Sequence, residues 1–280
     1  MNRRLNFFKF ALFTFAVLFC SCSQKKTASK EVSRIVCLCP SGLEILFATG
    51  AQDKIVAKTE QCNYPEEASS IPSAGGFDGS TLSAESILEY KPDFVYGSKG
   101  IHDLIASQLE QFGVRVYLSD ASSIADVFNE ILYISELTGT NKKGSALVQE
   151  MKDSLNQSLS IPLNKRVFYE LWNSPYMSVG GTSFMNDVLT YAGGINIFAE
   201  LKDPYPIVSE EAVVARDPEV IVISSMNGIS AEEICSRPAW KNVSAVKNKK
   251  VFLVDADIFT RPGPRVIEAV KILHEILIQD

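Results

Sequence analysis

Aromatic and polar residues stand in or directly after several apolar runs that the sequence predicts as β-strands. Aromatic rings at such positions can lie against the flat face of a macrocycle, while Asp257 and Arg261 hold its polar rim. Arg261 has a second interpretation, as a brace for the turn at residues 262–264. The chemistry indicated is the binding of a bulky, flat ligand. The candidate residues in or after predicted strands are Tyr64, Tyr96, Ser98, Lys99, Trp172, Asn173, Asp257, Phe259 and Arg261. Tyr205, in a predicted loop, is a further candidate.

Each aromatic residue has ordinary core packing as an alternative role. Phe168 and Phe184 lie inside predicted elements, which favours the core for both. Tyr64, Trp172 and Tyr205 are flanked by proline or asparagine in predicted loops, which favours the ligand site.

Direct binding of a metal ion by the protein is a weaker interpretation. His102 and His274 are the only histidines and stand far apart in the sequence, whereas metal sites need clustered ligands. His274 also lies on an apolar terminal helix, where a packed or surface position is the default. We therefore expect no protein-held metal and no cofactor.

The cysteines leave two possibilities open. Cys37 and Cys39 are two positions apart on one predicted strand and so face the same side. The extended backbone of a strand keeps their sulfur atoms too far apart to form a disulfide comfortably. Cys39 and Cys62 stand near the ends of neighbouring strands and could form a disulfide in an oxidising compartment. Thiolate binding of a metal also stays open, although the paired C-x-x-C spacing of a structural site is absent.

An enzyme is the competing functional class. The sequence has no G-x-S-x-G nucleophile turn, no phosphate loop ending in Gly-Lys-Ser/Thr, and no G-x-G-x-x-G after a strand. We therefore predict that the protein is not an enzyme. A hydrolase is the alternative, and turnover of a ligand by the purified protein would distinguish the two.

The elements that position these residues alternate between strands and helices. Strands are predicted at residues 33–40, 54–59, 93–97 and 114–119, and helices at 41–50, 82–90 and 102–113. Ser41 and Glu44 have capping-box spacing at the start of one helix. Residues 124–159 are helical almost throughout, with a break at 139–141. A second series follows, with strands at 166–172, 219–225 and 249–255 and helices at 183–192 and 264–279.

This order predicts an α/β fold of two lobes, each with a mainly parallel sheet flanked by helices, joined by a single long interlobe helix. The predicted divisions are a signal peptide at 1–21, a flexible tether at 22–33, an N-terminal lobe at 34–139, a linker helix at 140–161 and a C-terminal lobe at 162–280.

An internal repeat supports the division into lobes. Residues 82–98 and 208–224 align, with a serine N-cap and a glutamate two positions later in each. Glu85 and Glu211 have two interpretations. They either complement the positive helix N-terminus or form a matched pair of carboxylates, one per lobe, that a symmetric basic partner would bind.

The N-terminus has the order of a secretory signal. Arg3, Arg4 and Lys9 precede an apolar run at residues 10–20, which is shorter than the roughly 20 residues of a membrane-spanning helix. A small residue directly before Cys22 resembles the bacterial lipoprotein cleavage box, so Cys22 is predicted to be lipidated. Phe19 and Cys20 depart from that box, which leaves an ordinary signal peptide as the alternative.

Charge and composition exclude one class of partner. Removing residues 1–21 takes away three positive charges and changes the formal charge from −6 to −9. Nucleic acids bind basic surfaces, so a nucleic-acid partner is not expected. The hydrophobic content of 46% supports two filled cores.

Six segments carry a resemblance to a known family, and they occur in the order found in that family. From Arg34 onward the chain resembles the cobalamin and ferric-siderophore binding proteins of ABC importers, the helical-backbone metal receptor group. The segments are residues 34–51, 62–77, 82–97, 182–200, 208–223 and 261–270.

This resemblance implies a monomeric receptor, lipid-anchored on the extracytoplasmic face of a membrane, that delivers a metal chelate to an ABC transporter permease. It implies that Glu85 and Glu211 dock on permease arginines, and that the long helix limits lobe closure. Tyr205 matches a position where cobalamin-binding members have an aromatic residue. A corrinoid is therefore the first expectation for the ligand, with a ferric siderophore or haem as the alternative.

Overall fold

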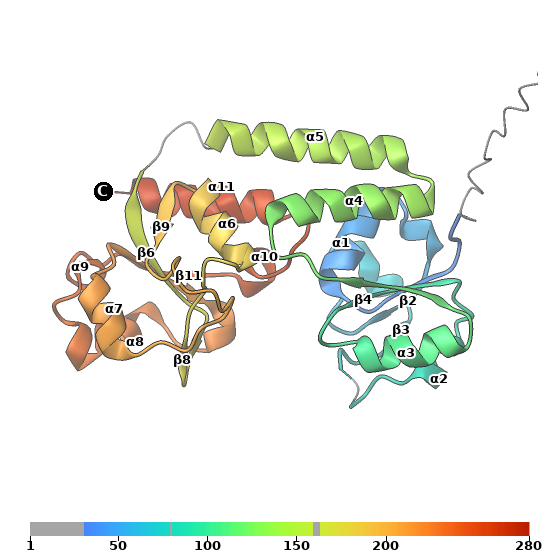
Figure 1. Ribbon diagram of the computed structural model, residues 1–280, viewed down its shortest axis with the longest axis horizontal. Helices are drawn as coiled ribbons and strands as arrows, with labels where there is room; N and C mark the ends of the chain where they lie inside the picture. The colour runs from blue at the N-terminus through green and yellow to red at the C-terminus, as the bar shows by residue number, and fades with distance from the viewer. Residues whose placement is uncertain (1–30, 79, 159–162, 280) are drawn as a thin grey trace, which may run out of the picture. The chain divides into compact units, whose positions relative to one another are not determined.

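Two parallel β-sheets organise the chain (Figure 1). The computed structural model describes residues 31–78, 80–158 and 163–279. The first sheet has the order β3-β2-β1-β4-β5 and the second β11-β10-β6-β9, and every pairing within them is parallel. The strands are β1 (Ile35–Cys37), β2 (Ile55–Thr59), β3 (Ser73–Gly75), β4 (Phe94–Ser98), β5 (Arg115–Ser119), β6 (Lys165–Glu170), β9 (Gly194–Asn196), β10 (Val220–Ser224) and β11 (Val251–Val254).

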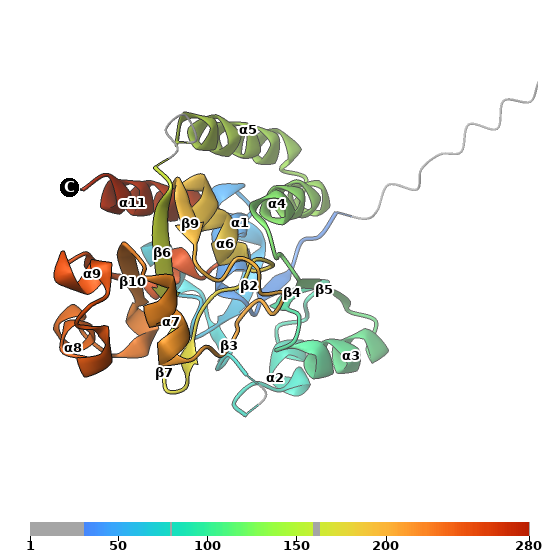
Figure 2. The same cartoon turned by 60° about the vertical axis from the view of Figure 1, so that its left-hand side comes forward.

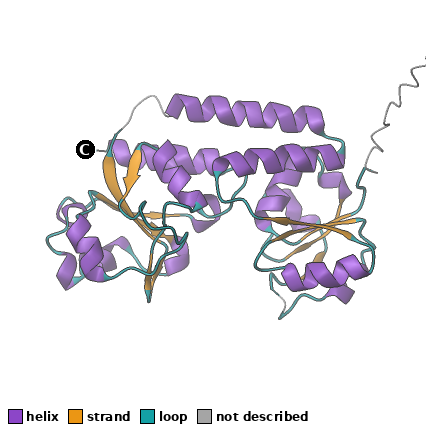
Figure 3. Cartoon of the chain, viewed as in Figure 1, coloured by secondary structure: helices purple, strands orange, loops and turns teal. Residues whose placement is uncertain are grey.

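Helices cover both faces of these sheets (Figure 3), as parallel strands require. They are α1 (Pro40–Ala48), α2 (Ala84–Leu88), α3 (Asp103–Gln111), α4 (Ile124–Thr138), α5 (Asn141–Ser158), α6 (Phe184–Tyr191), α7 (Glu210–Arg216), α8 (Ala231–Cys235), α9 (Ser244–Lys247), α10 (Ala256–Phe259) and α11 (Val266–Ile278). Short 3₁₀ turns η1 (Gln52–Lys54), η2 (Glu66–Ser70), η3 (Ser225–Asn227) and η4 (Pro238–Trp240) complete the helices.

The helical stretch predicted at residues 124–159 consists of two helices, α4 and α5, with a sharp turn between them. Gly139, in the left-handed conformation with φ of 70°, ends α4, and α5 starts two residues later. α5 then leads from the elements of the first sheet to β6, the first strand of the second. Its 18 residues span about 27 Å at 1.5 Å per residue. Figures 1 and 2 show α5 lying along α4 and α11.

One hydrophobic core continues from the first lobe into the second. Alternate residues of the strands from both sheets point into it, including Ile35, Tyr96 and Val167, and it takes in buried side chains of α4, α5, α6 and α11. The outer face of each sheet has its own smaller core, under α2 and α3 in the first lobe and under α7, α8 and α9 in the second. The lobes therefore share packing in addition to the connecting helix.

The start of α1 differs from the sequence prediction. The N-cap is Cys39 with Pro40 following, and no side chain caps the helix. Ser41 and Glu44 therefore do not form a capping box. Both lie inside the helix and are buried, and Glu44 is only 3% exposed. Pro40 explains the earlier start, because its ring favours the first turn of a helix.

Glu31–Asp280 form one compact unit. Within the described residues, no helix is both long and apolar enough to cross a lipid bilayer. The predicted signal peptide at 1–21, the lipidation site Cys22 and most of the tether at 22–33 lie outside the described residues.

Candidate ligand-binding site

An apolar cavity of about 400 Å³ opens beyond the carboxyl edge of the second sheet. Leu171 directly follows β6, Met226 follows β10, and Thr260 follows β11 and α10. Ligands of parallel α/β sheets bind beyond this edge because loops from successive strands converge there. The lining residues are Leu171, Trp172, Met177, Met185, Tyr205, Met226 and Thr260, none of which is charged.

A small hairpin, not predicted from the sequence, positions the two aromatic rings of this cavity. Strands β7 (Trp172–Asn173) and β8 (Tyr176–Met177) pair antiparallel around a cis Ser174–Pro175 bond. Met177 also bridges to Ile207, which brings the segment carrying Tyr205 alongside the hairpin. Trp172 and Tyr205, 33 residues apart in the sequence, therefore line one cavity.

Trp172 and Tyr205 both remain accessible to a ligand, and each is held in place by a hydrogen bond. The Trp172 indole N–H donates to the carbonyl of Ser174 at 3.2 Å, and the ring is 41% exposed. The Tyr205 backbone N–H donates to Asp203 at 2.9 Å, and its side chain is 45% exposed. The structure thus brings together these two predicted residues and adds Met177, Met185 and Met226. Methionine side chains adapt to irregular apolar surfaces.

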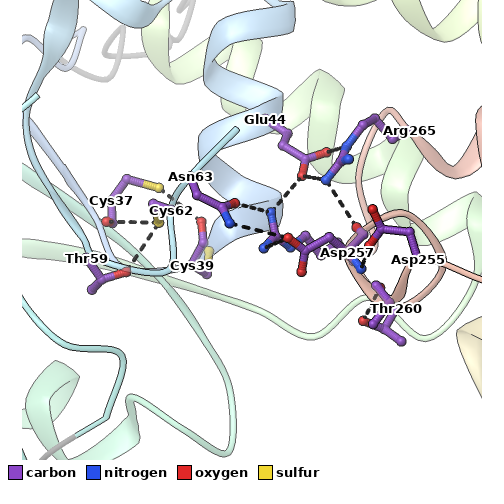
Figure 4. Close-up of polar contacts among 12 residues, drawn as sticks. Cys37, Cys39, Glu44, Thr59, Cys62, Asn63, Asp255, Asp257, Thr260 and Arg265 are labelled. Atoms are coloured by element: carbon purple, nitrogen blue, oxygen red, sulfur yellow. Dashed lines mark hydrogen bonds and ion pairs between the residues drawn. The ribbon is translucent and has the colours of Figure 1, made fainter. Parts of the chain in front are cut away.

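A polar cluster, separate from the apolar cavity, lies where the two lobes meet (Figure 4). Arg261 donates to Asn63 at 2.9 Å and forms an ion pair with Asp257 at 2.6 Å. Asn63 donates to Asp257 at 3.4 Å. The predicted ligand residues Asp257 and Arg261 therefore bind protein groups across the junction. The Arg261 side chain is only 11% exposed, and its hydrogen-bond and ion-pair partners are protein groups.

Sequence reasoning missed three residues of this cluster, namely Asn63, Arg265 and the buried Glu44. Glu44 lies at its centre. It accepts from Arg265 Nε at 3.0 Å and Nη2 at 2.6 Å, and from Arg261 Nη1 at 3.4 Å. The guanidinium of Arg265 also lies 4.1 Å from the centre of the Tyr64 ring. One signal pointed to Glu44, because it is a lone charge within the apolar helical run of residues 42–48.

Two predicted site residues are core residues instead. Tyr96 is fully buried, and its hydroxyl donates to Glu130. Phe259 is 1% exposed and packs 6.4 Å from the Tyr169 ring, centre to centre. The cause for Tyr96 is the period of the strand, which places it with Phe94 on the face that enters the shared core.

The remaining predicted residues lie apart from the aromatic cavity or at its edge. Ser98 ends β4, and its backbone N–H donates to His102 at 2.9 Å. Lys99 is exposed and forms an ion pair with Asp120 at 2.5 Å. Asn173 follows Trp172 in the hairpin. Tyr64, 45% exposed, lines a different and larger groove.

That larger groove, of about 1090 Å³, runs along α1 and α11 and shares no lining residue with the aromatic cavity. Tyr64 is the only predicted site residue in it, and its walls carry several charged side chains, including Lys143, Glu268 and Glu275. Aromatic rings and the carboxyl edge of a sheet coincide at the smaller cavity, which makes it the candidate ligand site.

The cysteines of the first lobe are free. Cys37, Cys39 and Cys62 are all buried, and the Cys39–Cys62 disulfide that the sequence left open is not formed. Cys62 instead contacts the Thr59 hydroxyl at 3.3 Å and the Cys37 carbonyl at 3.7 Å. Among the described residues, no group of histidine, cysteine and acidic side chains has the arrangement of a metal site.

Glu85 and Glu211 occupy equivalent positions in the two lobes. Ser83 caps α2 and Ser209 caps α7, each accepting from a backbone N–H three residues on at 3.1 Å. Both glutamates lie in the first helical turn and are exposed. Figures 1 and 2 place α2 and α7 on the side of the molecule opposite α5. A partner that contacts one lobe at this surface can also reach the other.

Known proteins resemble the chain along most of its length. The chain matches the family described as periplasmic binding proteins over residues 35–258. A vitamin B12-binding protein of Vibrio parahaemolyticus is 32% identical over 249 residues, covering 87% of this chain and 88% of the relative. An uncharacterised ABC transporter substrate-binding lipoprotein of Bacillus subtilis is 32% identical over 269 residues, covering 92% and 84%.

A solved structure supports the same assignment at the level of fold. A possible iron-binding periplasmic solute-binding protein of Staphylococcus epidermidis superposes with a TM-score of 0.79 at 28% identity. The match covers 89% of this chain and 100% of that one. The predicted α/β fold, with two parallel sheets flanked by helices, is thereby confirmed.

Proposed function

Because the chain belongs to the family of periplasmic binding proteins, we propose that it is the substrate-binding protein of an ABC importer and that its cargo is a corrinoid. The vitamin B12-binding relative supports the choice of cargo, and the Bacillus relative, a lipoprotein by name, supports a lipid anchor at Cys22. The protein works outside the cytoplasm and catalyses no reaction.

The observation that carries the choice of ligand is the chemistry of the aromatic cavity. Trp172 and Tyr205 offer ring faces, three methionines offer adaptable apolar surface, and no lining side chain is charged. The methyl-bearing edge of a corrin ring suits such an apolar surface. A strongly anionic ferric siderophore would need cationic side chains there, and the lining has none. The predicted cations Lys99 and Arg261 do not line the cavity, and each is bound to a carboxylate.

Glu85 and Glu211 would present this cargo to the transporter. One exposed carboxylate per lobe matches a permease with paired basic patches, because complementary charges steer encounter and set register. The protein would dock with α2 and α7 toward the membrane.

The ligand is tested by titrating the purified protein with cobalamin and cobinamide, using calorimetry and tryptophan fluorescence. We expect saturable one-to-one binding and a change in the emission of Trp172. A Trp172→Phe variant should lose most of the fluorescence change, because Trp240, the other tryptophan, is fully buried. It should keep much of the affinity, because phenylalanine still provides an aromatic ring. Tight binding of haem or of a ferric siderophore, with no response to either corrinoid, would refute this choice of ligand.

A further inference from the structure

Glu44 is a buried carboxylate whose partners all come from the other lobe. Its side chain is 2% exposed, and those of Arg261 and Arg265 are 11% and 13% exposed. The two arginines are 217 and 221 residues away in the sequence. A carboxylate removed from water needs close charged partners, so this contact keeps one set geometry.

The geometry at Arg265 is the stronger half of the contact. Two guanidinium nitrogens meet the two carboxylate oxygens of Glu44, at 3.0 and 2.6 Å. Such a two-pronged pair restrains direction as well as distance. Arg265 Nη2 also donates to the Asp257 carbonyl at 3.1 Å, which ties the start of α11 to α10.

The same arginines reach the loop after β2. The Arg265 guanidinium stacks on Tyr64, and Arg261 donates to Asn63, the preceding residue. Arg261 directly follows Thr260, which lines the aromatic cavity. Glu44 is therefore connected through one arginine to the Asn63–Tyr64 loop of the first lobe, and through the other to a wall of the cavity in the second.

We propose that Glu44 is a positioning residue for ligand capture: by holding Arg261 and Arg265 across the lobe junction, it sets the separation between the Asn63–Tyr64 loop and the aromatic cavity. Without this carboxylate, Arg261 keeps its ion pair with Asp257, whereas Arg265 keeps the hydrogen bond to the Asp257 backbone carbonyl in place of its two-pronged ion pair. The lobes then adopt a broader range of separations. The part of this proposal that concerns ligand rests on the proposed function, whereas the lobe separation does not.

The second lobe contains a matched control. Glu170 is likewise a buried carboxylate, and Arg237 binds both of its oxygens, at 2.6 and 2.8 Å. Both residues of this pair belong to the second lobe. Glu44→Gln and Glu170→Gln each remove the charge of a buried carboxylate that binds an arginine through both oxygens, so each should destabilise the protein. Only Glu44→Gln acts on the junction between the lobes.

The experiment measures the interlobe distance by electron-spin resonance in the absence of ligand. Spin labels are attached to cysteines introduced at Leu104 on α3 and at Lys241 after η4, both exposed, in a Cys235→Ser background. The other cysteines of the described chain, Cys37, Cys39 and Cys62, are fully buried and so protected from the label.

We expect Glu44→Gln to broaden the distance distribution while Glu170→Gln leaves it as in the unsubstituted protein. If both variants lose thermal stability and both keep the original distribution, Glu44 is an ordinary structural residue and the proposal fails. Should Glu44→Gln not fold, Arg265→Lys replaces it. That change keeps the charge but loses the two-pronged contact and the stack on Tyr64. A distribution unchanged by Arg265→Lys would equally overturn the proposal.

Ligand dissociation gives the second measurement. With cobalamin as the probe, Glu44→Gln should release it about tenfold faster, with Glu170→Gln close to the unsubstituted rate. Failure of the unsubstituted protein to bind cobalamin would count against the proposed function alone, because the distance measurement needs no ligand.

Discussion

At the scale of single residues, the position of a side chain within its element separates binding residues from core residues. Tyr96 and Trp172 both stand in apolar runs that were predicted as strands. Tyr96 lies within β4 and is fully buried, whereas Trp172 lies in a hairpin past the end of β6 and is 41% exposed. An aromatic ring beyond the strand end can meet a ligand, whereas one inside the strand meets the helices packed on the sheet.

Truncation of the two cavity rings tests this distinction. Trp172→Ala and Tyr205→Ala should each weaken cobalamin binding by about 1 to 3 kcal/mol, because each removes an aromatic anchor. Both side chains are more than two-fifths exposed, so thermal unfolding should change little. Calorimetry on the two variants measures the loss. Full affinity in both would place the ligand elsewhere, and the groove beside Tyr64 would be the next candidate.

At the scale of elements, a buried carboxyl joins α4 to the first sheet. Glu130, 3% exposed, accepts from the Tyr96 hydroxyl of β4 and from Ser119 of β5 at 2.8 Å. Burial raises the pKa of the Glu130 carboxyl, and the two hydroxyl donors oppose that shift only in part. The neutral form is therefore favoured in the folded protein relative to the unfolded chain.

This shift predicts a specific dependence of stability on pH. A raised folded-state pKa means that the contribution of Glu130 is fully present below the unfolded pKa of about 4.3 and is lost as pH rises through the folded value. A Glu130→Gln variant does not titrate at this position. Its melting temperature should gain on that of the unsubstituted protein as pH rises from 4 to about 8.

The matched control is Glu136→Gln, at an exposed position of the same helix. Its melting curve should run parallel to that of the unsubstituted protein over the same range. If the curve of Glu130→Gln also runs parallel, the carboxyl does not titrate differently in the folded state, and burial is offset by its hydrogen bonds.

At the scale of the whole molecule, the two lobes are coupled by more than the α5 connection. A core shared between the sheets and the contacts around Glu44 both cross the junction. Because a packed core resists small displacements, we expect ligand binding to move the lobes only slightly relative to each other. The surface formed by α2 and α7 then keeps a nearly constant spacing between Glu85 and Glu211.

That surface is tested by charge reversal. Glu85→Arg combined with Glu211→Arg should abolish transporter-dependent uptake in cells, because both docking carboxylates become repulsive toward a basic permease surface. Ligand affinity of the purified protein should stay unchanged, since both side chains are exposed and lie outside the cavity.

The control variant is Glu110→Arg combined with Glu150→Arg, which makes the same change in net charge at exposed positions of α3 and α5. It should retain uptake. Normal uptake by the Glu85 and Glu211 variant, or loss of its ligand binding, would show that these two residues are not a docking pair.

Local sequence patterns were sufficient for the elements and for the two equivalent helix starts. Short apolar runs predicted the strands β1, β2, β4, β5, β6, β10 and β11, and the serine N-caps Ser83 and Ser209 were correct. These features depend on residues within a few positions of one another, so the chain encodes them locally. The short strands β3, β7, β8 and β9 were not predicted. β7 and β8 have two residues each, and β3 and β9 contain glycine and few large apolar residues.

Contacts between distant segments required the tertiary structure. The spacing of Ser41 and Glu44 predicts a helix cap, but Arg265 approaches Glu44 from the other lobe and gives it a different role. In the same way, Cys39 and Cys62 stand near neighbouring strand ends, yet their thiols have other partners. A pattern in the sequence shows which face of an element is apolar or charged. Which group meets that face depends on how elements hundreds of residues apart pack together.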